Sequence, residues 1–392
     1  MATPLNEKFC LKGDRKNFTV NFRVNPEDRA AYFGTKKLNE KIIDDIRQRY
    51  MMGSQPKKFL WGQYGCGKTH TLFNIQYALE ENQDESSELE YKVRCRLINA
   101  EFKQKTNYNY LHSQMMEALT LEAVKEVAEL YLAKNAGSGL EQKLREDFGD
   151  SNTARAMRAL VYSGDPVTLW KWLCGGNLSA AELNSYSLTK NMDTVEELYR
   201  VLNGIGGLFA EKYIYYLFLF DEMEGLQNIS NNDSQESFHV AFRKLADDEN
   251  SVVGFIVSIH AMREEDIPYF IYAEDIKTRL NQANIHQLDY YNSAEDVKQF
   301  LKDLFKLVVD EGKRAKKEQA GLIPGGMEYY PLSDHALEEL VDLATGAPTA
   351  SLPRNFISAL NEAAVHAAGR DSCTIETEDL GSATLIFREP GM

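Results

Sequence analysis

The chain has 392 residues, of which 43% are hydrophobic, so it can bury one large core or two unequal ones. Its formal net charge of −15 argues against a surface that coats nucleic acid or anionic membrane without discrimination. The N-terminal residues lack the apolar core of a signal peptide, and the sequence has no run of about 18 apolar residues. We therefore expect a cytoplasmic protein with no membrane partner. The cysteines are scattered, which argues against a disulfide framework or a zinc site: Cys10, Cys66, Cys95, Cys174 and Cys373.

The most specific pattern is a Gly-x-x-x-x-Gly-Lys-Thr run within "KFLWGQYGCGKTHTL". An apolar run precedes it and apolar residues at helical spacing follow it, which predicts a strand-to-helix turn. Such a turn points backbone N–H groups inward at the positive end of the helix dipole, an arrangement that binds phosphates. The alternative is a chance match in a glycine-containing turn. The predicted nucleotide contacts are Gly62, Gln63, Tyr64, Gly65, Cys66, Gly67, Lys68, Thr69 and His70.

Two residues of this run have specific predicted roles. We expect Lys68 to reach the β- and γ-phosphates of a nucleotide as a positive charge. We expect the Thr69 hydroxyl to bind Mg²⁺. The sequence therefore predicts ATP and Mg²⁺ as ligands.

The rest of the chain predicts an α/β fold. Alternation over 91–102 indicates a second strand, and the apolar runs 213–222 and 251–260 are typical of strands covered on both faces. A parallel sheet with helices on both faces accommodates these strands. Residues 104–212 are mostly helical and too long for an ordinary connection, so we interpret them as a helical insertion. We predict a nucleotide-binding domain over 1–290, with that insertion, and a helical lid domain over 291–392.

Acidic residues follow one buried strand, in "LFLFDEMEGL". A buried carboxylate with a second one beside it is costly unless a cation is near. We therefore assign Asp221 to Mg²⁺, directly or through water, and Glu222 to the general base that polarises the attacking water. Glu224 is interpreted as a solvated or supporting carboxylate. The alternative is an acidic turn after a core strand.

The strand that ends in "FIVSIHAMRE" brings two polar residues to the carboxyl edge of the sheet. Either Ser258 or His260 is predicted to contact the γ-phosphate or the attacking water, and the sequence leaves the choice open. A histidine in this position can equally be a structural residue.

Taken in order, these residues resemble those of AAA+ ATPases over about 30–104 and 210–380. Arg279 in "DIKTRLNQ" is similar to an SRF-like arginine, and Arg354 in "SLPRNFISAL" is similar to the arginine of the second sensor. The resemblance implies that both act in catalysis. Two features depart from the family pattern. The second-sensor glycine is replaced in "ASLPRN", and the insertion is long.

Two further resemblances concern the biological role. The segment "YFGTKKLNEKIIDDI" resembles the one that precedes the loop in origin-recognition-type initiators, which implies that Tyr32 and Phe33 pack on adenine. The segment from "TLWKWLCGG" to "DEMEGL" is similar to bacteriophage-exclusion (BREX) ATP-binding proteins. These resemblances imply an ATP-hydrolysing switch that acts with an effector protein on duplex DNA, in phage defence or mobile-element targeting.

The resemblance to AAA+ ATPases also implies self-assembly with ATP into a ring or filament. Arg279 would then act as an arginine finger in a neighbour's site, with Arg263 as the next choice. The basic stretches 47–58 and 312–319 are either solvated loops or contacts to DNA. The alternative function is a signalling or scaffold ATPase whose nucleotide state controls assembly with an effector, without DNA binding.

Overall fold

The structure is a computed structural model and describes residues 4–21, 27–30, 36–81, 92–135, 140–247, 251–288, 293–346 and 352–381. Its contacts divide the chain into two compact units. The first unit comprises residues 1–41, 62–78 and 287–392, and the second comprises 42–61 and 79–286. Within the described residues, no helix combines the length and apolarity that a membrane span requires.

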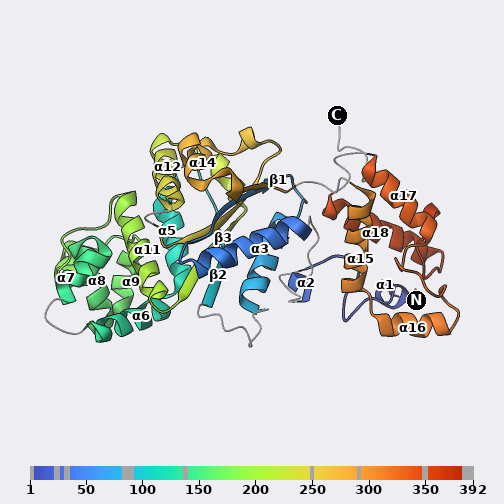
Figure 1. The fold of residues 1–392 in the computed structure, drawn as a ribbon, viewed down its shortest axis with the longest axis horizontal. Coiled ribbons are helices and arrows are strands. Elements are labelled where there is room, and N and C mark those ends of the chain that lie inside the picture. Colours follow the sequence, from blue (N-terminus) through green and yellow to red (C-terminus); the bar gives the residue numbers. More distant parts are fainter. Residues whose placement is uncertain are drawn as a thin grey trace. The chain divides into compact units, whose positions relative to one another are not determined.

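A five-stranded parallel sheet with the order β2-β3-β4-β1-β5 confirms the predicted fold class (Figure 1). The central strands β1, β3 and β4 are mostly buried and rich in apolar residues, because the sheet is covered on both faces. The edge strand β2 alternates between exposed and buried residues. The strands span β1 (Lys57–Gly62), β2 (Lys92–Asn99), β3 (Ile214–Asp221), β4 (Gly254–His260) and β5 (Ile285–Gln287).

The predicted insertion between β2 and β3 is helical. Figure 1 shows α5 and α11 beside the sheet, where they contact β2 and β3, and α6 to α9 gathered beyond them. The amphipathic α11 buries one apolar face in the same core as β3 and β4. The helices span α5 (Tyr108–Leu119), α6 (Leu121–Lys134), α7 (Leu140–Phe148), α8 (Ser151–Tyr162), α9 (Pro166–Leu173), α10 (Ala180–Ser185) and α11 (Val195–Ala210).

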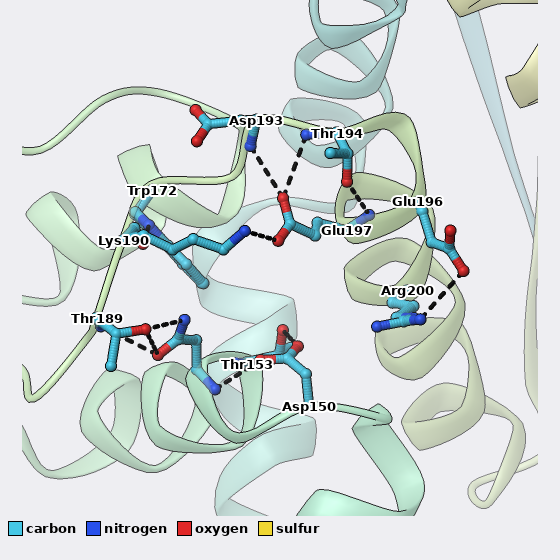
Figure 2. A network of polar contacts seen from close by, with 11 residues as sticks. Asp150, Thr153, Trp172, Thr189, Lys190, Asp193, Thr194, Glu196, Glu197 and Arg200 are labelled. Carbon is cyan, nitrogen blue, oxygen red and sulfur yellow. Dashed lines mark hydrogen bonds and ion pairs between the residues drawn. The ribbon is translucent and has the colours of Figure 1, made fainter.

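Side-chain caps fix the ends of the insertion helices. Thr194 and Glu197 form a capping box at the start of α11, in which the Glu197 carboxylate accepts from the backbone N–H groups of Asp193 and Thr194 at 3.0 and 3.2 Å. Figure 2 shows the same carboxylate paired with Lys190, 2.5 Å away. This pair holds the loop before α11 against the helix and lowers the pKa of Glu197 despite its partial burial.

A buried histidine makes the stability of the insertion pH-dependent. His112 of α5 is fully buried, its Nε2 lies 2.9 Å from the Leu173 carbonyl oxygen, and burial lowers its pKa to about 4. Because the unfolded chain takes up the proton first, the contribution of neutral His112 is complete above about pH 6.5 and is lost between about pH 6.5 and 4.

We therefore expect acidification across that window to cost about 3 kcal/mol of unfolding free energy through His112 alone. Urea unfolding at several pH values measures this cost in the wild type and in His112→Gln. The variant should show a shallower fall of stability with pH. Identical slopes for the two proteins would contradict the assignment.

The helices after β5 form a core of their own, distinct from the core around the sheet. They span α15 (Ala294–Val308), α16 (Glu311–Gln319), α17 (Asp334–Thr345) and α18 (Pro353–Gly369). Phe9, Leu11 and Phe18 lie in this core, next to the short helix α1 (Leu5–Lys8). The boundary at residue 290 did not anticipate that N-terminal residues pack with the C-terminal helices.

The remaining helical segments range from single turns to the 16-residue α3. They are α2 (Glu27–Ala30), α3 (Lys36–Met51), α4 (Lys68–Gln76), the π-helical turn η1 (Tyr77–Glu81), η2 (Met223–Asn228), α12 (Asn232–Ala246), η3 (Glu264–Asp266), α13 (Tyr269–Tyr272), α14 (Glu274–Leu280), η4 (Gln282–Asn284) and η5 (Thr377–Leu380).

Candidate functional site

The glycine-rich loop leads directly from β1 into α4. Gly65 and Gly67 have φ values of 82° and 94°, in the left-handed region that glycine adopts without strain. Thr71 closes the first turn of α4 by donating its N–H and its hydroxyl to the Gly67 carbonyl oxygen, at 2.8 and 3.0 Å. The loop therefore has the curvature and the helix start that a phosphate-binding turn needs.

Lys68 lies across this loop. Its Nζ donates to the carbonyl oxygens of Gly62 and Gln63 at 2.9 and 2.8 Å and lies 5.8 Å from the centre of the exposed Tyr64 ring. Cys66 is buried beside it, and burial raises the pKa of the Cys66 thiol. The thiol stays neutral, so no anion competes inside the loop with a phosphate.

Gly62 is required by close packing. A Cβ at this position would lie 2.6 Å from the Leu288 carbonyl oxygen and 2.9 Å from Cys66 Sγ. We expect Gly62→Ala to lower the unfolding free energy by about 1–3 kcal/mol. Gly207→Ala in the interior of α11 is the matched control, because a Cβ there meets nothing within 4 Å and should stabilise by about 0.5–1 kcal/mol. Thermal denaturation of both variants tests the contrast, and equal shifts would contradict it.

Thr69 and His70 follow Lys68 in the first turn of α4. Thr69 is half-buried. His70 is buried, and its Nε2 lies 3.3 Å from the Asp28 carbonyl oxygen of α2. The structure thus shows His70 holding the N-terminal segment, and its predicted contact with nucleotide stays a prediction. Tyr32 and Phe33, the predicted adenine contacts, lie outside the described residues.

Arg354 lies beside the phosphate loop. It occupies the first turn of α18, where Pro353 starts the helix. A Cβ on Gly65 would be 3.0 Å from Arg354 Cβ and 3.4 Å from its Cδ, so the arginine stem packs on the loop backbone. The loop and α18 belong to the same compact unit. The structure therefore brings together two groups that lie almost 290 positions apart in the sequence.

The acidic pair follows β3 in the second unit. Asp221 is the last residue of the strand and is 1% exposed, and its Oδ1 accepts a hydrogen bond from the Ser258 hydroxyl at 3.2 Å. Glu222 has φ 56° and ψ 35°, an unusual backbone conformation for glutamate, and its side chain is exposed. The sharp turn separates a buried carboxylate from an exposed one, as the two predicted roles require.

Ser258 and His260 both lie on β4, and the Ser258 hydroxyl donates a hydrogen bond to Asp221. His260 ends the strand and is half-buried. The parallel register of β3 with β4 pairs Phe220 with Val257, which brings Ser258 alongside Asp221.

One polar residue at this edge was missed in the sequence. Asn99 ends β2 and lies opposite Asp221 in the parallel register. The signal was present, because Asn99 is exposed and directly follows the apolar end of a strand. Alternation over 91–102 predicted the strand but not which residue would face the acidic pair.

The candidate finger residues lie farther along the second unit. Arg279 of α14 is half-buried, and its Nη1 donates to the Asp275 carbonyl oxygen of the same helix at 2.8 Å. Arg263 has a side chain that is 74% exposed and pairs with Glu265 and Asp266. Neither arginine has a described contact to the acidic pair of its own chain.

Four lysines of the two basic stretches bind acceptors within the protein. Lys57 and Lys58 are buried, and their Nζ atoms donate to the Asp247 carbonyl oxygen and the Asp45 carboxylate, each at 2.7 Å. In α16, Lys313 and Lys317 donate to the carbonyl oxygens of Leu11 and Lys8 at 2.8 and 2.9 Å. The stretches lie partly in α3, β1 and α16 and are not wholly loops, and α16 has no buried residue, so its basic residues remain at the surface.

The parallel sheet, its strand order, the glycine-rich loop between β1 and α4 and the acidic pair after β3 define the fold of an AAA+ P-loop NTPase. The structure of Aeropyrum pernix ORC2 in ADPNP and ADP complexes is similar, with a TM-score of 0.51 at 12% identity, over 96% of this chain and 72% of that chain. Its ADP form gives a TM-score of 0.50 at 12% identity, over 96% and 73% of the two chains.

A structure of Aeropyrum pernix ORC1 in complex with DNA has a TM-score of 0.46 at 14% identity, over 93% of this chain and 68% of that chain. No protein-family model matches the sequence, and no curated protein does either. At 12% identity, the two ORC2 structures support the fold alone.

Proposed function

We propose that the protein binds and hydrolyses ATP as an AAA+ switch. The observation that carries this proposal is the glycine-rich loop with Lys68 across it and the Arg354 stem packed on Gly65. Phosphates offer acceptor oxygens to Lys68 in place of the two loop carbonyls, and a guanidinium beside the loop supplies a second positive charge. The similar ORC2 structures contain ADPNP and ADP, which supports nucleotide as the ligand.

Hydrolysis would use the acidic pair at the carboxyl end of β3. Glu222, exposed at the turn, would accept a proton from the attacking water. Ser258, bonded to Asp221, is the better supported first sensor, and Asn99 would orient the Glu222 carboxylate. His260 remains the second candidate sensor.

The available donors fit Mg²⁺. The Thr69 hydroxyl and the Asp221 carboxylate are hard oxygen ligands, and Mg²⁺ usually takes one or two protein ligands together with substrate phosphates. No cluster of three or more His, Cys, Asp or Glu side chains that could hold a metal occurs in the described part of the chain. When bound, Mg²⁺ would neutralise charge on the phosphate oxygens.

Assembly would complete the site with an arginine from a neighbouring copy. Arg279 lies in the region after β4, where Met262 and Tyr269 are 63% and 68% exposed. Exposed apolar side chains suit a contact between copies. We therefore propose that ATP drives formation of a ring or filament in which Arg279 stabilises the charge that develops on a neighbour's γ-phosphate.

Mixing variants tests this assembly. Arg279→Ala should keep ATP affinity and lose turnover, and Lys68→Ala should lose binding. A mixture of the two should recover activity, because each supplies what the other's interface lacks. Wild-type turnover should also rise more than linearly with protein concentration. A wild type that stays monomeric with ATP and is equally active at every concentration would exclude the assembly.

Two biological roles use this chemistry. The first is a switch that acts with an effector protein on duplex DNA, in phage defence or mobile-element targeting, as the resemblances to initiators and BREX ATP-binding proteins imply. The second is a signalling or scaffold ATPase without DNA binding. The net charge of −15 favours the second role for the isolated chain.

A salt-titrated binding assay with duplex DNA separates these roles. It is run with and without ATP and Mg²⁺. ATP-dependent binding that weakens steeply with salt would support the DNA switch, because each neutralised phosphate releases a counterion. Absence of binding in every nucleotide state would support the signalling role.

A further inference from the structure

The N-terminal residues are built into the core of the C-terminal helices. Phe9, Leu11 and Phe18 are at most 1% exposed, and the Phe18 ring lies 6.1 Å from those of both Phe9 and Phe305 of α15. The Phe18 N–H donates to the Asn361 side chain of α18 at 2.8 Å. Burial of three large apolar side chains anchors this segment firmly.

Hydrogen bonds and an ion pair also hold this N-terminal segment. Lys8 Nζ donates to the Ala368 carbonyl oxygen of α18 at 2.9 Å and pairs with Asp371. Lys313 and Lys317 of α16 donate hydrogen bonds to the carbonyl oxygens of Leu11 and Lys8. The segment over residues 4–21 is therefore held from two sides by the C-terminal helices.

A buried ion pair connects this segment to α2. Arg15 and Asp28 have side chains that are 5% and 0% exposed. The Arg15 guanidinium binds both Asp28 oxygens and also donates to the Thr19 carbonyl oxygen at 3.3 Å. The Asn21 N–H donates to Asp28 at 2.7 Å. Such a pair is costly to break once buried, so α2 is fixed relative to residues 15–21.

Helix α2 in turn is bound by α4, the helix that begins at Lys68. His70 Nε2 lies 3.3 Å from the Asp28 carbonyl oxygen, and Asn74 donates to the Arg29 carbonyl oxygen at 2.7 Å. The Arg29 guanidinium stacks 5.4 Å from the centre of the Phe73 ring. Positions 70, 73 and 74 share one face of α4, so this side of the helix contacts the N-terminal segment.

We propose that Arg15 is a positioning residue for the phosphate loop. Through Asp28 and α2, Arg15 fixes α4, the helix whose first turn carries Lys68 and Thr69. Through residues 4–21, Arg15 also connects α4 to α18, the helix that carries Arg354. Nucleotide binding and docking of the N-terminal segment are consequently linked, so each strengthens the other. This inference rests on the proposed nucleotide binding.

Three variants test the positioning role. Arg15→Gln removes the guanidinium, Arg15→Lys keeps the charge, and Lys16→Gln removes one positive charge from the exposed neighbouring position. ATP affinity is measured by calorimetry and folding by circular dichroism and thermal denaturation. We expect Arg15→Gln to bind ATP on the order of tenfold more weakly, Arg15→Lys to recover part of the loss, and Lys16→Gln to match the wild type. A folded Arg15→Gln with wild-type affinity would overturn the inference.

Hydrogen exchange on the wild type tests the positioning role of Arg15 even if Arg15→Gln fails to fold. Binding of a non-hydrolysable ATP analogue should increase protection of amides in residues 4–21 and 27–30, and Lys68→Ala should show no such gain. Protection confined to the phosphate loop would overturn the link. If the wild type binds no nucleotide, the proposed function fails as well. Nucleotide binding without N-terminal protection refutes the positioning role alone.

Discussion

Lys68→Ala is expected to abolish measurable ATP binding, with an affinity loss on the order of 100-fold or more. The Lys68 ammonium lies within 3 Å of two carbonyl oxygens of the loop, at 2.9 and 2.8 Å, where an incoming phosphate would replace them as acceptor. Alanine removes this charge and leaves the loop carbonyls facing the phosphate with no cation between them. Calorimetric titration with ATP and Mg²⁺ measures the loss.

The matched control for Lys68→Ala is Lys125→Ala. Lys125 lies on α6 in the helical insertion and pairs with Glu129 at 3.9 Å, so its loss removes the same charge far along the chain from the loop. An exposed pair of this kind contributes little to stability. Wild-type ATP affinity in Lys68→Ala would refute the assignment of the loop. A loss of ATP affinity in both variants would show that the change in net charge, and not the position of Lys68, causes the effect.

Glu222→Gln is expected to retain ATP binding and to slow turnover by about 100-fold to 10,000-fold. Glutamine has the shape of glutamate but cannot accept the proton of the attacking water, so ATP should remain bound and unhydrolysed. Single-turnover phosphate release, together with ATP retention on a filter, measures both properties.

Glu224→Gln is the control for this prediction. Glu224 lies in the first turn of η2, two residues after Glu222, and is half-buried. We expect its amide variant to keep most of the turnover. Equal turnover in the wild type and Glu222→Gln would remove Glu222 as the base, and a large loss only in Glu224→Gln would transfer the role to that residue.

Local patterns predicted the phosphate loop and the central strands. A Gly-Lys-Thr sequence between an apolar run and an amphipathic run is sufficient, because strand, turn and helix all form within about 20 residues. The acidic pair was predictable for the same reason, since Asp221 directly follows a buried strand. The helical insertion followed from its length and periodicity.

Long-range packing was not predictable in the same way. The four residues of α1 carry no distinctive pattern, yet Lys8 contacts Asp371, 363 positions away. The basic residues Lys57 and Lys58 read as surface charges in the sequence, and only the structure shows the acceptors that bury them. The sequence leaves the choice between Ser258 and His260 open, and alternation along one strand does not specify the register that places Ser258 beside Asp221. Arg354 was assigned through resemblance, and its contact with Gly65 depends on the tertiary fold.

The most direct test of the account is phosphate release from ATP by the purified wild type, compared with Lys68→Ala under identical conditions. The assay is run with Mg²⁺ and with excess chelator, over a range of protein concentrations. We expect phosphate release by the wild type to require Mg²⁺ and to rise more than linearly with protein concentration. We expect no phosphate release by Lys68→Ala. Wild-type release no greater than that of Lys68→Ala at every concentration, with and without duplex DNA, would contradict it.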